Sequence, residues 1–123
     1  MTQIGRITLV VATLAALLAG CGSSGPTAQN VVDALGPLFP VGNQRDNTGT
    51  CEPTGCEQLI TTDAVSVYQW PDEDAAVSFA TGLGDVVQQI GPFVLSYAGT
   101  EQQLTPRGAR AAFAARVRTL LEG

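Results

Sequence analysis

The stretch from Val86 to Tyr97, VVQQIGPFVLSY, decides the fold. Its valine, isoleucine, phenylalanine and tyrosine residues favour β-strands. Gly91 and Pro92 interrupt the stretch, and proline cannot donate a hydrogen bond to the ladder of a central strand. The stretch therefore forms either a hairpin or one bent strand, and we favour a hairpin that turns at Gly91 and Pro92.

A second stretch, LITTDAVSVYQW from Leu59 to Trp70, also predicts a strand, with a candidate kink at Asp63. Successive side chains of a strand point to opposite faces, which separates Val65 and Val67 from Ser66, Tyr68 and Trp70. Aromatic residues in strands usually belong to the core. The alternative is a ligand groove between the sheet and the helices, lined by Tyr68, Trp70, Phe93 and Tyr97.

Helical signals precede and separate these stretches. Thr27 can cap a helix over residues 28–35, and the Gly-Pro pair at 36–37 should end it. Asp72 begins a second helix that reaches about Thr81, because its small and aromatic residues recur with helical spacing.

The last helix has Thr105 as its N-cap and Pro106 in its first turn. Its apolar stripe comprises Ala109, Phe113, Val117, Leu120 and Leu121. The order of helices and strands predicts one α+β domain over residues 27–123. We expect a small two-layer sandwich, in which a mainly antiparallel sheet carries helices on one face.

The first 20 residues have the pattern of an export signal. Arg6 precedes the uncharged run ITLVVATLAALL, which spans Ile7 to Leu18. As a signal helix this run would be about 18 Å long, too short for a hydrocarbon core of about 30 Å. Its length suits the apolar region of a signal peptide instead.

The run ends in Leu18-Ala19-Gly20-Cys21, which resembles the lipobox of bacterial lipoproteins. The resemblance implies cleavage between Gly20 and Cys21 and a lipid anchor on the Cys21 thiol, with acyl chains such as palmitate. It divides the chain into a signal peptide (1–20), a lipidated cysteine with a Gly/Ser tether (21–26) and the domain. It also implies that the mature protein is anchored on the extracytoplasmic face of the cell membrane. The alternative is an ordinary secretory signal followed by a free cysteine.

Charge and composition exclude several classes of function. The formal net charge is −5, and the chain contains no His and no Lys. This balance argues against nucleic acid as a partner and against electrostatic adhesion to anionic lipid headgroups, so we expect the acyl chains, and not charge, to attach the protein to the membrane. Without His, catalytic systems such as Ser–His–Asp cannot form within the chain. We therefore expect no enzyme, no cofactor and no catalytic residue.

Residues 40–58 form a long polar loop that contains Cys51-Glu-Pro-Thr-Gly-Cys56. With Cys21 acylated, Cys51 and Cys56 remain as an even pair in an oxidising compartment, and the Pro and Gly between them supply a turn. We predict a disulfide between them. A redox pair lacks the Cys-x-x-Cys spacing, and a zinc site lacks further ligands, so we expect no metal.

Two other polar groups have two interpretations each. Residues 45–48, Arg-Asp-Asn-Thr, could form a recognition patch, but we favour a turn stabilised by its own side chains. The acidic run at residues 72–74 could bind calcium, but we favour the electrostatic preference of acidic side chains for a helix N-terminus.

The domain resembles a group of small actinobacterial secreted or lipid-anchored proteins. The similar stretches are residues 45–48 (RDNT), 55–63 (GCEQLITTD), 65–68 (VSVY) and 93–97 (FVLSY). The resemblance implies one extracytoplasmic domain and no activity. We therefore expect a membrane-anchored lipoprotein whose domain is a non-enzymatic interaction module for an envelope protein or ligand. The alternative is a lipoprotein that binds a small molecule or a lipid.

Overall fold

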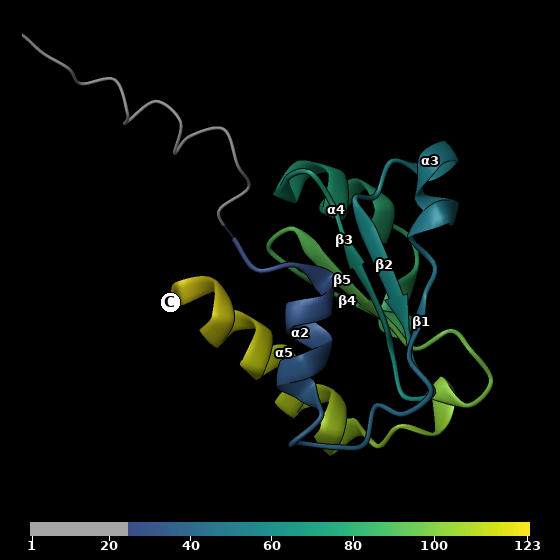
Figure 1. The fold of residues 1–123 in the computed structure, drawn as a ribbon, viewed down its shortest axis with the longest axis vertical. Coiled ribbons are helices and arrows are strands. Elements are labelled where there is room, and N and C mark those ends of the chain that lie inside the picture. The colour runs from purple at the N-terminus through teal and green to yellow at the C-terminus, as the bar shows by residue number, and fades with distance from the viewer. Residues whose placement is uncertain (1–24) are drawn as a thin grey trace, which may run out of the picture.

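A five-stranded sheet runs through the centre of the structure (Figure 1). The computed structural model describes residues 25–123, so the expected signal helix, the cleavage point at Gly20 and the lipid site at Cys21 lie outside the described residues. The strand order is β1-β2-β3-β5-β4, and every neighbouring pair is antiparallel. The strands are β1 (Arg45–Asp46), β2 (Gln58–Thr61), β3 (Ser66–Gln69), β4 (Val87–Ile90) and β5 (Phe93–Ser96).

The predicted hairpin over residues 86–97 is confirmed. Ile90 of β4 pairs with Phe93 of β5, and Gly91 lies in the turn with a φ of 57°. A Cβ atom at Gly91 would lie 2.8 Å from the Leu121 side chain. The left-handed backbone therefore favours glycine at this turn, and a larger residue would also have to displace the end of the Leu121 side chain.

The single strand predicted over Leu59 to Trp70 is wrong, because β2 and β3 form a second hairpin. The buried hydroxyl of Thr62 organises its turn: it accepts hydrogen bonds from the amides of Ala64 (3.1 Å) and Val65 (3.0 Å) and donates one to the Val65 carbonyl (2.8 Å). Such local side-chain bonds compete with an extended backbone. The chain therefore reverses at Asp63, where we had expected only a kink.

Helix α2 (Ala28–Leu35) begins as predicted. The Thr27 hydroxyl accepts from the Asn30 amide (3.1 Å), and the Asn30 side chain accepts from the Thr27 amide (2.9 Å). Two further amides of the first turn, those of Ala28 and Gln29, donate to the side chains of Gln69 (2.9 Å) and Gln58 (2.8 Å). The exposed donors of the helix start are thus satisfied partly by the β2–β3 hairpin.

Helix α5 (Arg107–Glu122) begins one residue later than a Thr105 cap would place it. Pro106 is the N-cap, with an extended backbone and no side-chain hydrogen bond, so the predicted cap is wrong. The Thr105 hydroxyl instead donates to the buried Ala64 carbonyl at 2.8 Å. Within the predicted stripe, Phe113 and Val117 are fully buried.

The helices cover both faces of the sheet. Helices α2 and α5 pack together on one face, and α4 (Glu73–Ala80) lies on the other with the short α3 (Cys51–Thr54) (Figure 1). The α+β class and the antiparallel sheet are confirmed. The prediction of helices on one face describes α2 and α5 but not α4, which packs against β4 and β5 from the opposite side.

Strand alternation produces two hydrophobic clusters, one on each face. The larger cluster, beneath α2 and α5, includes Val31, Leu35, Ile60, Val67, Phe93, Leu95, Tyr97, Phe113 and Val117. The smaller cluster, beneath α3 and α4, consists of Cys51, Cys56, Leu59, Trp70, Ala76 and Val94, with partly buried residues that include Tyr68 and Phe79.

Candidate functional site

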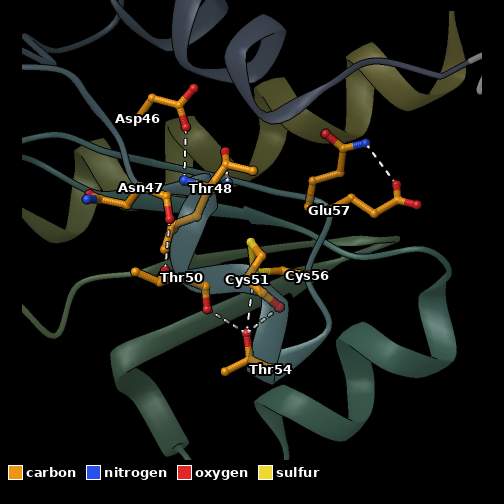
Figure 2. Close-up of a disulfide and its surroundings, with 10 residues drawn as sticks. Asp46, Asn47, Thr48, Thr50, Cys51, Thr54, Cys56 and Glu57 are labelled. Carbon is orange, nitrogen blue, oxygen red and sulfur yellow. Dashed lines mark hydrogen bonds between the residues drawn. A yellow bond between two sulfur atoms is a disulfide. The ribbon is translucent and has the colours of Figure 1, made fainter.

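The predicted disulfide between Cys51 and Cys56 is present (Figure 2). The two Cα atoms are 4.8 Å apart, and both side chains are buried. Gly55, with a φ of 98°, ends α3 and turns the chain back toward Cys51. This buried bridge fixes the long loop against the smaller cluster, in agreement with a structural staple.

The four residues at 45–48 do not form one patch. The Asp46 carboxylate accepts from the Thr48 amide at 2.9 Å, and the Thr48 hydroxyl and amide hold the pKa of the Asp46 carboxyl below its usual range. The Asn47 carbonyl accepts from the Thr50 amide and hydroxyl (Figure 2). These three residues stabilise their own turn, as we favoured, whereas Arg45 turns toward Asp63.

A concavity of about 330 Å³ lies on the α4 face of the sheet, at the end where β2 finishes and β3 begins. We call it the sheet-end concavity. Its floor is a row of hydroxyls brought together by the strand register, in which Thr61 pairs with Ser66 and Ser66 pairs with Ser96. The loop over residues 98–102 forms one wall.

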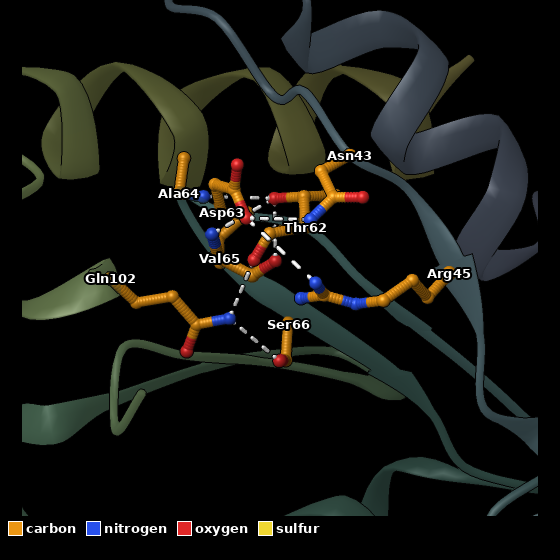
Figure 3. Close-up of polar contacts among 8 residues, drawn as sticks. All are labelled: Asn43, Arg45, Thr62, Asp63, Ala64, Val65, Ser66 and Gln102. Carbon is orange, nitrogen blue, oxygen red and sulfur yellow. Dashed lines mark hydrogen bonds and ion pairs between the residues drawn. The ribbon is translucent and has the colours of Figure 1, made fainter. Parts of the chain in front are cut away.

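Gln102 makes that wall rigid. Its side chain is 5% exposed, and its Nε2 donates to the Thr62 carbonyl (2.8 Å) and the Ser66 hydroxyl (2.9 Å) (Figure 3). Its Oε1 accepts from the Gly99 amide at 2.9 Å. A buried amide with both ends satisfied holds its neighbours in one arrangement. Sequence reasoning missed Gln102, because its contacts bridge distant segments and leave no periodic signal.

Opposite charges stand at the mouth of the concavity. Arg45 Nη1 lies 3.8 Å from Asp63 Oδ1, and the Asn43 side chain donates to the same oxygen at 3.2 Å (Figure 3). The side chains of Arg45 and Asp63 are 45% and 40% exposed, so their ion pair contributes at most about 1 kcal/mol. Both groups can therefore exchange partners with a ligand at little cost.

Tyr68 contributes the aromatic side of the concavity. Its phenol is protonated at neutral pH and can donate a hydrogen bond. Burial raises its pKa further above the usual range. The concavity thus combines one cation, the two carboxylates of Asp63 and Glu101, and neutral hydroxyls. This set suits reversible recognition of a polar group.

The aromatic groove considered from the sequence does not form. Tyr68 and Trp70 belong to the smaller cluster, whereas Phe93 and Tyr97 belong to the larger one on the opposite face. The interpretation as core residues is confirmed for Trp70, Phe93 and Tyr97, which are buried. Tyr97 is further fixed by donating to the Gln88 side chain at 2.7 Å and by the Arg110 guanidinium 4.3 Å above its ring.

The acidic run at 72–74 acts at a helix start, as favoured from the sequence. The Asp72 side chain is the N-cap of α4 and accepts from the Ala75 amide at 2.8 Å. Among residues 25–123, no three acidic or cysteine side chains are grouped so that they could hold a metal ion.

Comparisons with protein-family models, with curated proteins and with solved structures find no match for this chain. Over the part of the chain that the structure describes, no helix is both long and apolar enough to cross a membrane.

Proposed function

We propose that this chain is a membrane-anchored extracytoplasmic lipoprotein and that its domain is a non-enzymatic interaction module of the cell envelope. The anchor rests on the order of Arg6, the apolar run and the lipobox-like Leu18-Ala19-Gly20-Cys21. The Cys51–Cys56 disulfide adds support, since such bonds persist in oxidising compartments outside the cytosol and Cys21 is left as the third cysteine.

The sheet-end concavity is the observation that carries the interaction role. It gathers hydrogen-bonding groups from three strands and a loop around a loosely paired Arg45 and Asp63. Its hydroxyl floor and charged mouth match the polar surface of an exposed protein segment in the envelope. The rigid wall at Gln102 means that little conformational entropy is lost when a partner binds.

Site-specific photocrosslinking in living cells tests the interaction. A photoreactive residue at Thr100, on the rim of the concavity, should give a defined crosslinked product. The matched control is the exposed Ser78 of α4, outside the concavity. Equal crosslinking from both positions, or none from Thr100, would contradict the proposal.

The anchor is tested separately by Cys21→Ala. The intact mass of the wild-type protein should include a diacylglyceryl thioether on Cys21, whereas the variant should be released from the membrane or remain as uncleaved precursor. An unchanged mass and unchanged membrane retention of Cys21→Ala would refute the anchor.

A small polar molecule is the second candidate occupant of the concavity. Its volume, about 330 Å³, is at the lower end of the usual range for ligand sites, about 300–1,000 Å³, and its hydroxyl and charged lining disfavours a lipid tail. Native mass spectrometry of protein released gently from cells should then detect one added mass that Arg45→Gln loses. A protein without added mass, together with a Thr100 crosslink to protein, would favour the interaction module.

A further inference from the structure

The basic residues of the domain are concentrated on one helix, α5. Helix α2, which packs beside it, adds one exposed acidic residue, Asp33. In residues 25–123 every arginine except Arg45 lies on α5, and Glu122 is the only acidic residue of that helix. The segments around α3 and α4, residues 51–58 and 72–80, contain several acidic residues and no arginine: Glu52, Glu57, Asp72, Glu73 and Asp74. Asp85 instead lines a hollow shared with Arg107 and Arg110 of α5. The net charge of the chain is negative, but α5 is a basic helix.

The exposed surface of α5 carries small side chains and is flanked by arginines. With about 100° between successive residues, Gly108, Ala111 and Ala115 lie along its solvent-facing stripe, and all three are exposed. Arg107 and Arg118 fall on one flank and Arg116 on the other, and all three are exposed. Among the described residues the one ion pair joins Arg45 and Asp63, so none of these three arginines is held in an ion pair. Glu122, one turn after Arg118, is the single carboxylate on the same stripe.

The chain enters the domain beside this surface. Helix α2 begins at Ala28 and packs against α5. The stretch from Cys21 to Thr27 can span at most about 20 Å when fully extended. Ala28 bonds to Gln69, the neighbouring Trp70 amide bonds to Pro92, and Leu121 approaches Gly91. The start of α2 and the end of α5 thus share one end of the sheet.

We propose that α5 lies on an anionic lipid surface and thereby orients the anchored domain. This inference rests on the proposed lipid anchor, which supplies the attachment, while the arginines of α5 select the face that meets the headgroups. The small side chains between them let the helix approach, and the long arginine side chains reach headgroup phosphates from both flanks. The acidic α4 face, which holds the sheet-end concavity, then points away from the bilayer and remains accessible.

Arginine footprinting on vesicles tests the orientation. The acylated full-length protein is inserted from outside into preformed vesicles of phosphatidylcholine alone or with phosphatidylglycerol, then treated with phenylglyoxal and mapped by mass spectrometry. With the anionic lipid, Arg107, Arg116 and Arg118 should react roughly fivefold more slowly. Arg45, on the opposite face with 45% side-chain exposure, is the internal control and should not change. In 1 M salt, where the Debye length is about 3 Å, the protection should disappear.

Variants separate electrostatic docking from other causes. Replacing both Arg116 and Arg118 by Gln should abolish the protection of Arg107, whereas Arg45→Gln should leave it intact. Equal protection on neutral vesicles overturns the inference. Protection that appears without vesicles and grows with protein concentration also overturns the inference, because it indicates that a second copy of the chain covers α5. Protection that appears only when an envelope extract is added overturns it as well, because it indicates an acidic protein as the partner.

The same samples distinguish failure of the anchor from failure of the orientation. An intact mass without acyl groups overturns the proposed anchor and this inference together. An acylated protein that floats with both kinds of vesicle but reacts equally at the α5 arginines overturns the orientation alone.

Discussion

The two hydrophobic clusters differ in how they are held together. The cluster beneath α2 and α5 is mostly aliphatic. It is covered by α2, whose N-terminus is held by a capping box, and by the 16-residue helix α5. The cluster beneath α3 and α4 is covered by an eight-residue helix in which only Ala76 is buried. It relies on the disulfide and on aromatic contacts. The rings of Tyr68 and Trp70 are stacked, and the tilted ring of Phe79 has its centroid 4.8 Å from each of theirs.

This difference between the two clusters indicates which face of the sheet contributes most to stability and which face is accessible to a partner. Burial of apolar area supplies most of the free energy of folding, so the α2/α5 face should dominate stability. The α4 face is less completely covered and leaves room for the sheet-end concavity. Within residues 25–123, the one buried side-chain nitrogen or oxygen without a partner, Trp70 Nε1, also belongs to this face.

Truncation of Phe113 should have the largest effect. Its ring is fully buried and meets Phe39 edge-on at 6.3 Å, so Phe113→Ala should lower the free energy of unfolding by about 3–5 kcal/mol. Urea titration followed by circular dichroism measures the loss. The control Leu104→Ala, at a side chain that is 80% exposed, should change it by no more than about 0.5 kcal/mol. A similar loss in both variants would break the assignment of stability to the larger cluster.

Loss of the disulfide should cost less. The bridge closes a short loop, with a sequence separation of 5, so replacing Cys51 and Cys56 together by Ala should lower the free energy of unfolding by about 2 kcal/mol. Trp70, the single tryptophan, lies in the same cluster, and its fluorescence should report the change. Peptide mapping without reductant checks the premise, since free thiols at both positions would refute it.

Tyr97→Phe should cost about 1 kcal/mol at neutral pH through loss of the hydrogen bond to Gln88. Burial raises the pKa of the Tyr97 phenol above its usual range, although the nearby Arg110 partly opposes this. The wild-type stability linked to this group is complete below about pH 10 and declines above it, since the unfolded chain releases the proton first. The variant should therefore show a flatter decline in unfolding free energy above pH 10. An unchanged alkaline slope would contradict this origin.

Trp70→Phe should have the smallest effect of the four. The substitution reduces the volume of a side chain that is only 4% exposed, but it also removes the unpartnered Nε1 donor. These effects oppose one another, so the net change should be below about 1 kcal/mol. A loss as large as that of Phe113→Ala would show that the smaller cluster carries as much stability as the larger one.

Local signals predicted most of the fold. The Gly91-Pro92 interruption, the Thr27 cap and the acidic helix start at Asp72 each act through nearby residues, and each has the predicted role. The β2–β3 turn was missed because Thr62 and Val65 are β-branched and resemble strand residues, whereas a side-chain hydroxyl decides their conformation. A residue type alone does not reveal that competition.

The candidate site was only partly predictable. Cys51 and Cys56 were paired correctly because they are close in sequence and their count is even. The sheet-end concavity depends on strand register and on Gln102, whose partners Thr62 and Ser66 lie 40 and 36 residues away. Such contacts arise only when the sheet has formed. Arg45 was singled out in the sequence, but its neighbour Asp63 was expected within a strand.

The glutamine contacts at the start of α2 have a mechanical consequence. Gln69 and Gln58 lie opposite each other in the β2–β3 hairpin, and each holds one amide of the first turn of α2. A force applied at Gly25 would therefore pass into two strands of the sheet through two separate hydrogen bonds before it could unwind α2. Tension on the chain would be shared by two paired strands of the sheet instead of concentrating on a fraying helix end.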